Sequence, residues 1–255
     1  MMAPMGRLEQ RSADYRWSHT GREKARAYDL RFTANPHRAM MWTLEREVLD
    51  TIVRTRFGGQ IGAYLDFACG TGRIVAHLER YAASATGVDI SADMLEIARS
   101  RSERAELIEC DITRSACLQG RSFDLITAFR FFPNAQPNLR SEALEILASL
   151  LTEEGYLVFN NHLNASSLML RLARMLRASR GLGMTENEVR ELVGSAGLRI
   201  VARYHLGVAP SNERVMVLPR TLLEPIERFA SRWRALHPLA QNIIYVCQRD
   251  TRREP

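Results

Sequence analysis

Tyr64-Leu65-Asp66-Phe67-Ala68-Cys69-Gly70-Thr71-Gly72-Arg73-Ile74-Val75 is the stretch that decides the fold of this chain. Its apolar start predicts a buried strand, its glycines predict a tight turn, and apolar residues at helical spacing from Ile74 onward predict a helix. Gly70 and Gly72 lack the side chains that would keep a ligand away from the backbone. The expected helix start at Arg73 offers free N–H groups to polar or negative atoms. The stretch therefore predicts a strand, a loop and a helix that together hold a small molecule.

Three aspartates follow three successive predicted strands. Asp66 ends the strand before the glycine turn, Asp89 ends the next strand, and Asp111 follows the third. Because the carboxyl ends of parallel strands share one edge of a sheet, we expect these side chains to meet there. Asp89 can accept both hydroxyls of a ribose, and Asp111 can accept from the exocyclic amine of an adenine packed between Met94 and Ile112. This edge suits a nucleoside without phosphates.

In these motifs the chain resembles the class I S-adenosylmethionine-dependent methyltransferases. The matching segments are Asp66-Phe67-Ala68-Cys69-Gly70-Thr71-Gly72, Gly87-Val88-Asp89-Ile90-Ser91 with Met94-Leu95 and Ala98, Cys110-Asp111-Ile112, and Phe123-Asp124-Leu125-Ile126-Thr127-Ala128-Phe129. The resemblance covers residues 60–207 and the final strand. It implies a Rossmann-like α/β fold with a seven-stranded sheet, mostly parallel, whose last strand is antiparallel. A nicotinamide cofactor is disfavoured, because the third glycine of that fingerprint would fall at Val75.

The resemblance also implies S-adenosylmethionine as cofactor and S-adenosylhomocysteine as product. The residues expected to bind the cofactor are Tyr28, Asp66, Ala68, Cys69, Gly70, Gly72, Asp89, Ile90, Met94, Asp111, Ile112 and Phe129. Ala68 stands where this family often has glycine. Tyr28 with Asp29 is similar to a tyrosine–aspartate pair in the N-terminal helices of small-molecule methyltransferases; a half-buried helix tyrosine without that role is the alternative.

The composition is that of a globular α/β chain with one core. The chain has 255 residues, of which 46% are hydrophobic and 25% charged. Its net charge is +6, yet Lys24 is its only lysine, and no stretch concentrates the arginines into a basic tail. The charge is therefore weak evidence for a nucleic-acid partner.

The cysteines and the N-terminus favour a cytoplasmic protein. Cys69, Cys110, Cys117 and Cys247 form no CxxC pair, so we expect reduced thiols. The N-terminus carries charged residues in place of an apolar signal region, and no apolar run is long enough to cross a membrane. Neither export nor a membrane span is expected.

The chain alternates strands and helices, which predicts a parallel sheet with right-handed crossovers. Strands are expected at 64–68, 85–89, 105–109, 123–128, 155–160, 198–206 and 242–248, and helices at 73–81, 92–103, 138–151 and 185–195. Residues 1–60 are expected to form an N-terminal helical cap after an irregular tail of about 20 residues. Residues 61–255 then form the core, with helical insertions at about 161–184 and 207–240.

The insertion at 161–184 is expected to be an amphipathic helix. Leu168, Leu172, Met175 and Leu176 share one face, and Arg171, Arg174, Arg177 and Arg180 recur on the other. A surface helix with a solvated basic face is one interpretation. A lid over the substrate, or a contact with an anionic membrane surface, is the other.

Two residues at strand ends are candidates for the chemistry. Arg130 follows the fourth strand, where its guanidinium can clamp a carboxylate or phosphate of the acceptor beside Phe131 and Phe132. His162 follows the fifth strand and can act as a general base, with a structural loop histidine as its rival interpretation. No metal-ligand spacing is visible.

The sequence thus predicts methyl transfer to a small molecule, with O-methylation of an amphipathic or anionic metabolite preferred. The absence of an Asn/Asp-Pro-Pro-aromatic motif after the fourth strand disfavours methylation of nucleic-acid bases or amides. An RNA or protein methyltransferase, or a non-catalytic cofactor-binding partner subunit, are the alternatives. A homodimer and peripheral membrane contact stay open.

Overall fold

The computed structural model describes residues 15–17, 21–175, 183–214 and 216–251. The strands are β1 (Ile61–Phe67), β2 (Ala82–Asp89), β3 (Glu106–Glu109), β4 (Phe123–Ala128), β5 (Leu151–Asn161), β6 (Leu198–Leu206) and β7 (Asn242–Arg249). The helices are α2 (Arg22–Ala34), α3 (Pro36–Phe57), α4 (Val75–Leu78), α5 (Ala92–Arg101), α6 (Pro137–Ser149), α7 (Leu168–Met175), α8 (Glu186–Ser195) and α9 (Arg220–Ala230). The 3-10 helices are η1 (Tyr15–Trp17), η2 (Glu79–Tyr81) and η3 (Arg234–Leu239).

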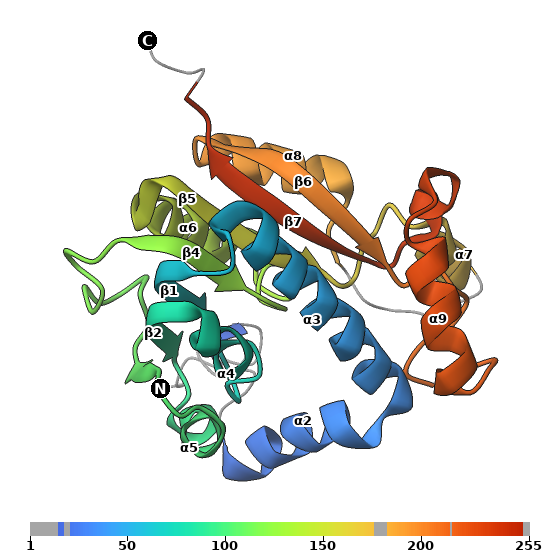
Figure 1. The fold of residues 1–255 in the computed structure, drawn as a ribbon, viewed down its shortest axis with the longest axis horizontal. Coiled ribbons are helices and arrows are strands. Elements are labelled where there is room, and N and C mark those ends of the chain that lie inside the picture. Colours follow the sequence, from blue (N-terminus) through green and yellow to red (C-terminus); the bar gives the residue numbers. More distant parts are fainter. Residues whose placement is uncertain (1–14, 18–20, 176–182, 215, 252–255) are drawn as a thin grey trace, which may run out of the picture.

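All seven strands form one sheet in the order β3-β2-β1-β4-β5-β7-β6 (Figure 1). The pairs β1–β2, β2–β3, β1–β4 and β4–β5 are parallel, and β7 is antiparallel to both β5 and β6. The predicted Rossmann-like sheet with an antiparallel last strand is confirmed. The order reverses between β1 and β4, which is where an open α/β sheet binds its ligands.

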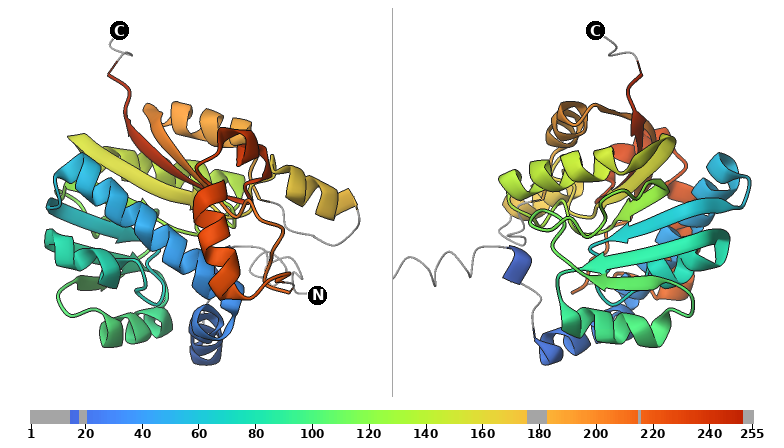
Figure 2. Two further views of the ribbon diagram at one scale, coloured as in Figure 1. Left: turned by 45° about the vertical axis from the view of Figure 1, so that its right-hand side comes forward. Right: turned by 90° about the vertical axis from the view of Figure 1, so that its left-hand side faces the viewer.

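Helices cover both faces of the sheet, so the protein has three layers (Figure 2). One face carries α6 and α8, whose apolar residues pack on side chains such as Leu65 and Phe159. The other face carries α3, α4, α5 and Leu223 of α9, packed on residues such as Tyr64 and Val158. Helix α3 begins with Pro36 after the Asn35 cap, whose side chain accepts from the Arg38 N–H.

Several boundaries differ from the sequence prediction. The helix after the glycine turn begins at Val75, not Arg73, because the buried Asp66 carboxylate accepts the Val75 N–H and residues 71–74 stay in turns. The expected irregular tail is wrong for residues 15–17, which form η1. The capping box at Thr185 and Glu188 starts α8 as the sequence indicates.

Helix α7 forms within the first insertion, but its apolar side is exposed instead of packed. Leu168, Leu172 and Met175 are 50%, 54% and 80% exposed. Leu176, Arg177 and Arg180 lie outside the described residues. In the part of the chain that the structure describes, no helix is both long and apolar enough to cross a membrane.

Candidate active site

A pocket of about 790 Å³, part of it open to solvent, lies at the carboxyl ends of β1, β2, β3 and β4. Its lining residues are Tyr15, Arg16, Tyr28, Phe67, Ala68, Gly70, Val88, Asp89, Ile90, Ser91, Met94, Cys110, Asp111, Ile112, Thr113, Phe129, Arg130, Phe131 and Leu139. Most residues expected to bind the cofactor therefore meet at one site. The exceptions are Asp66, Cys69 and Gly72, which do not line it.

The glycine turn and the end of β2 are joined through Asp89. One carboxylate oxygen accepts the Gly70 N–H at 2.8 Å, and the other accepts the Ser91 N–H at 2.9 Å. The Ile90 N–H also donates to this carboxylate, which has about four acceptor sites and so keeps capacity for a further donor. Burial raises the pKa of Asp89 above its usual range. The residue is thus fixed in the pocket with acceptor capacity left for a ligand hydroxyl.

The backbone of the turn is shaped to leave room for a ligand. Gly70 has φ +55°, and a Cβ at this position would meet nothing within 4 Å. At Gly72, by contrast, a Cβ would lie 2.8 Å from the Cβ of Ala98, so α5 packs directly on the turn. Ala68 adopts φ 53°, a left-handed conformation that glycine adopts without strain. This explains why the resembled family often has glycine there.

Asp66 stabilises the turn from below. It is 1% exposed, and it accepts hydrogen bonds from the Val75 N–H at 3.0 Å and the Thr127 hydroxyl at 2.7 Å. Burial raises its pKa to about 7, although both hydrogen bonds oppose that shift. Asp66 thus links the end of β1 to the start of α4 and does not line the pocket itself.

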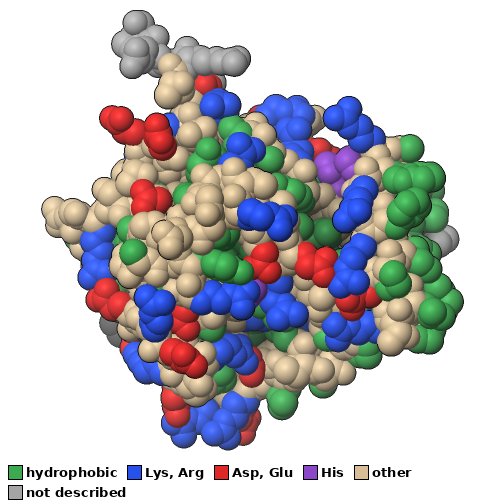
Figure 3. Space-filling model, viewed as in Figure 1, with side chains coloured by type: hydrophobic (Ala, Val, Ile, Leu, Met, Phe, Trp, Pro, Cys, Tyr) green, Lys and Arg blue, Asp and Glu red, His purple; other side chains and the backbone are tan. Residues whose placement is uncertain are grey.

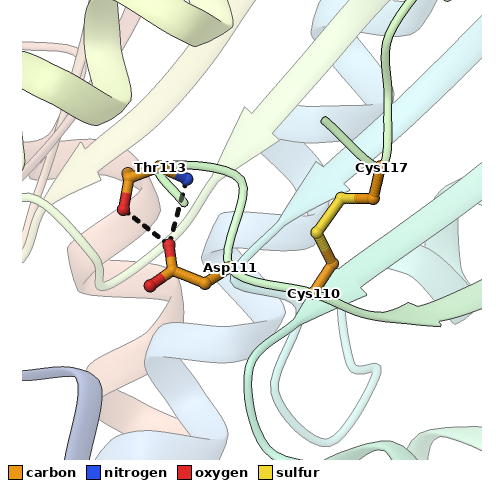
Figure 4. Close-up of a disulfide and its surroundings, with 4 residues drawn as sticks. All are labelled: Cys110, Asp111, Thr113 and Cys117. Atoms are coloured by element: carbon orange, nitrogen blue, oxygen red, sulfur yellow. Dashed lines mark hydrogen bonds between the residues drawn. A yellow bond between two sulfur atoms is a disulfide. The ribbon is translucent and has the colours of Figure 1, made fainter. Parts of the chain in front are cut away.

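Asp111 also lines the pocket, but its carboxylate already has partners. Arg16 Nε donates to Oδ2 at 2.9 Å. The Thr113 hydroxyl and N–H donate to Oδ1 at 2.6 and 3.0 Å (Figure 4). A ligand amine must therefore share this carboxylate with Arg16. Sequence reasoning missed Arg16, because it lies 95 residues away in η1.

The segment that carries Asp111 is closed by a disulfide between Cys110 and Cys117 (Figure 4). The expectation of four reduced thiols is wrong for this pair, because the loop after β3 returns Cys117 to Cys110. Cys69 and Cys247 are free and buried. The disulfide thus constrains the backbone on both sides of Asp111.

Residues of η1 cover part of the pocket. The Tyr15 hydroxyl donates to the Arg130 carbonyl at 3.2 Å, and the Tyr15 N–H donates to Gln136 Oε1 at 3.1 Å. The Tyr15 ring meets Phe131 edge-on, with 5.7 Å between centroids. Burial raises the pKa of the Tyr15 phenol, so it stays a donor. Nothing in the local sequence pattern indicated this contact.

Arg130 follows β4 at the mouth of the pocket. It adopts φ 62°, a left-handed conformation that is strained for a residue with a side chain. Its N–H donates to Asn160 Oδ1 at 2.7 Å, and its carbonyl accepts from Asn134 Nδ2 at 2.6 Å. Phe131 lines the pocket, whereas Phe132 is fully buried against Phe159. The expectation that Phe132 forms a pocket wall is therefore wrong.

Three guanidinium groups surround the ring of Phe32 in α2. The guanidinium carbons of Arg73, Arg38 and Arg130 lie 4.2, 5.1 and 5.5 Å from its centroid. We call these three side chains the arginine cluster. Arg38 pairs with Glu213 at 2.8 Å, and Arg73 pairs with Glu45 at 3.3 Å.

Among the described residues, no acid forms an ion pair with Arg130, which leaves the cluster with one more cation than anion. The excess positive charge lies on the pocket lining, because Arg130 is the cluster member that lines the pocket.

Glu45 of α3 connects the cluster to the strand ends. It is 3% exposed, and its Oε1 accepts from Asn160 Nδ2 and Asn242 Nδ2, both at 3.0 Å. Because Asn160 also accepts the Arg130 N–H, one network joins α3, β4, β5, β7 and the glycine turn. An acid beside the apolar stripe of a predicted helix was the signal available in the sequence.

His162 follows β5 and does not line the cofactor pocket. Its Nδ1 is buried and has no hydrogen-bond partner among the described residues. Burial, together with the charges of Arg130, Arg38 and Arg73, lowers the pKa of His162 well below its usual value. The imidazole is therefore neutral near pH 7 and stands close to the arginine cluster.

Within the part of the chain that the structure describes, no group of three or more His, Cys, Asp or Glu side chains could hold a metal ion.

Comparisons with known proteins agree with this fold. A family model described as "Methyltransferase domain" matches residues 65–155. A Geobacillus sp. (strain WCH70) protein named as a methyltransferase is 33% identical over 102 residues, covering 38% of this chain and 41% of that protein. The dTDP-3-amino-3,6-dideoxy-alpha-D-glucopyranose N,N-dimethyltransferase of Streptomyces fradiae is 37% identical over 107 residues, covering 41% and 39%. The chain thus spans about two fifths of the length of these curated relatives.

Solved structures extend the likeness beyond the matched segment. Magnesium protoporphyrin IX methyltransferase from Synechocystis PCC 6803, with bound S-adenosylhomocysteine, aligns with a TM-score of 0.59 and 16% identity. The alignment covers 83% of this chain and 84% of that chain, and it shows a shared fold. The sheet order and this alignment show the fold of the class I S-adenosylmethionine-dependent methyltransferases, and the family model matches residues 65–155 as a methyltransferase domain.

Proposed function

We propose that this protein transfers a methyl group from S-adenosylmethionine to an oxygen of a small amphipathic acceptor that carries an anionic group. The bound cofactor supplies an activated methyl group on its sulfonium, so the protein contributes binding and alignment. Asp89 would hold the ribose hydroxyls, with Gly70 and Ala68 against the backbone side of the ligand. Met94 and Ile112 would enclose the adenine near Asp111.

Tyr28, Ile90 and Phe129 complete the proposed cofactor site, since all three line the pocket. Asp66, Cys69 and Gly72 would act one layer behind, through the shape of the turn. The fit is supported by the open space in front of Gly70 and by the unused lone pairs of Asp89.

The observation that carries the acceptor proposal is the arginine cluster. Three guanidinium groups converge on Phe32, and within the described part of the chain two carboxylates pair with them. A buried or half-buried cation without a counter-charge is costly, so an anion from the acceptor would restore the balance. Arg130 presents two N–H groups in the geometry that suits a carboxylate.

The same cluster bears on the role of His162. Cations nearby favour the ionised form of an acidic oxygen, which then needs little help to attack the methyl group. The neutral imidazole of His162 can still accept a proton from an acceptor hydroxyl, although its lowered pKa makes it a weak base. An acceptor oxygen that ionises readily, such as a carboxylate, fits both residues.

The proposal is tested by methyl transfer from radiolabelled S-adenosylmethionine to a panel of aromatic and medium-chain carboxylic acids, each beside its uncharged amide. We expect methylation of acids and none of the amides. One hydrogen bond to a charged group is worth about 1.5–3 kcal/mol. Arg130→Gln should therefore lower kcat/KM about 10- to 100-fold.

Two controls separate the acceptor from the cofactor. Arg121→Gln removes an exposed arginine paired with Glu106 away from the site, and it should keep full activity. The Kd for S-adenosylhomocysteine should be the same in Arg130→Gln as in the parent. A parallel loss of cofactor affinity would show that Arg130 holds the methionyl carboxylate instead. Methylation of RNA or protein alone, or no turnover despite cofactor binding, would contradict the small-molecule assignment.

A further inference from the structure

The exposed apolar side chains of this protein are gathered at one place. The large hydrophobic residues that the structure shows exposed are Leu30, Leu168, Leu172, Met175, Val217, Leu218, Leu222, Ile226, Phe229 and Trp233. All but Leu30 belong to α7 or to the segment 217–233 that contains α9. We call the side chains of these two segments the apolar face. A patch of this kind marks an interaction site, because isolated exposed apolar residues would be scattered.

The two segments lie at one end of the molecule (Figures 1 and 2). The Ser167 hydroxyl, just before α7, donates to the Leu239 carbonyl at 2.8 Å, and Asn164 Nδ2 donates to the Ala240 carbonyl at 2.9 Å. These bonds fix α7 beside η3, which directly follows α9. Hydrophobic side chains gather at the edge of the molecule where α9 lies (Figure 3).

Helix α9 is held so that its apolar side faces outward. On its inner side, Leu223 is 2% exposed, and the buried Glu227 carboxylate accepts the Val208 and Ala209 N–H groups at 2.7 and 2.9 Å. On its outer side, Leu222, Ile226 and Phe229 recur at helical spacing and are 46–60% exposed. The helix cannot turn this side inward without breaking the bonds of Glu227.

Charge decides between the partners that could cover this face. Arg171 and Arg232 are exposed in the same two segments, and Arg234 is exposed directly after the second. Residues 168–175 contain no acid, and residues 217–239 contain two, Glu224 and Glu227. Glu224 pairs with Arg220 and Arg228, and Glu227 is buried. A second copy of the chain docked face to face would bring arginines against arginines. An anionic surface would instead neutralise them.

We propose that the apolar face docks on an anionic lipid surface. Phe229 and Trp233 lie in contact, with 5.1 Å between ring centroids, and aromatic rings of this kind are favoured at the boundary between headgroups and acyl chains. Leu168, Leu172, Ile226 and Leu222 would enter the apolar layer, while the arginines reach the headgroups. The docking proposal does not depend on the proposed methyl transfer, and each is tested by its own experiment.

The test is flotation of the purified full chain with vesicles of phosphatidylcholine alone and of equal parts phosphatidylcholine and phosphatidylglycerol. We expect binding to the anionic vesicles, weaker binding to the neutral ones, and release by high salt. The double variant Ile226→Ser, Phe229→Ser should lower the partition coefficient at least about tenfold. Leu30→Ser, an apolar exposed residue outside the face, serves as the matched control and should bind like the parent.

Three results would overturn the proposal. One is no binding to either vesicle, and another is equal binding by the double variant and the parent. The third is a parent protein that sediments as a dimer and does not bind vesicles, together with a double variant that sediments as a monomer. This result would show that a second copy of the chain covers the face. Retained circular dichroism and thermal midpoint of the double variant establish that it folds; serine at two exposed positions should leave both unchanged.

Discussion

Replacing Asp89 by alanine perturbs the residue on which the proposed cofactor binding most depends. The carboxylate accepts the Gly70, Ser91 and Ile90 N–H groups, and under the proposal it also holds the two ribose hydroxyls. A hydrogen bond to a charged group contributes about 1.5–3 kcal/mol, so losing two costs about 3–6 kcal/mol. At about 1.4 kcal/mol for each factor of ten, the Kd for S-adenosylhomocysteine should rise at least about 100-fold.

The assay is isothermal titration of the purified protein with S-adenosylhomocysteine, and its main confound is folding. Asp89→Ala also leaves three backbone N–H groups, those of Gly70, Ser91 and Ile90, without this acceptor, which lowers stability. Asp124→Ala is the matched control. Asp124 accepts the Ala63 N–H at 2.8 Å and the Thr152 hydroxyl at 3.1 Å, near the start of β4 and away from the pocket.

Both variants should unfold at lower temperature than the parent, but only Asp89→Ala should lose the ligand. Unchanged affinity of Asp89→Ala would refute the assignment of the ribose to this carboxylate. Equal loss of affinity in both variants would show that the effect comes from general destabilisation of the sheet and not from a contact with the ligand.

Three further predictions follow from single residues. Ala68→Gly should raise the free energy of unfolding by about 1 kcal/mol, because it relieves a left-handed alanine at φ 53°; a lower denaturation midpoint would contradict this. Burial and the neighbouring His237 and Arg203 lower the pKa of His205 to about 4, so the folded state resists protonation that the unfolded chain accepts near pH 6.5. Stability should therefore fall between pH 6.5 and pH 4, by about 1–2 kcal/mol after allowance for partial exposure, and His205→Gln should remove that part of the pH dependence in urea titrations; identical profiles would refute it. Thiol titration of the unfolded chain should count only Cys69 and Cys247 without reductant and all four cysteines with it, whereas four thiols without reductant would exclude the disulfide.

The parts of the molecule that the sequence predicted are those set by short-range pattern. Strand periodicity, the glycine turn and the acid at the end of β2 all depend on residues within a few positions of one another. Their convergence then follows from the parallel sheet, because the carboxyl ends of parallel strands share one edge. Ala68, Asp89 and Asp111 follow three such ends and line the same pocket.

What the sequence could not predict depends on contacts between distant segments. Arg16 reaches Asp111 across 95 residues, and Glu45 reaches Asn242 across 197. Neither contact can be read from local periodicity, so the residues around Arg16 were expected to form an irregular tail, and Glu45 offered only its position beside the apolar stripe of a helix. Likewise, Phe131 and Phe132 are adjacent in sequence, and only the turn at Arg130 decides which one faces the pocket.

The most direct test of the account is a crystal structure of the protein with S-adenosylhomocysteine. We predict that the ribose hydroxyls lie within hydrogen-bond distance of Asp89, that the adenine lies between Met94 and Ile112, and that the sulfur faces the side of the pocket where Arg130 lies. Ligand density elsewhere, or a pocket left empty at saturating ligand in solution, would contradict the account.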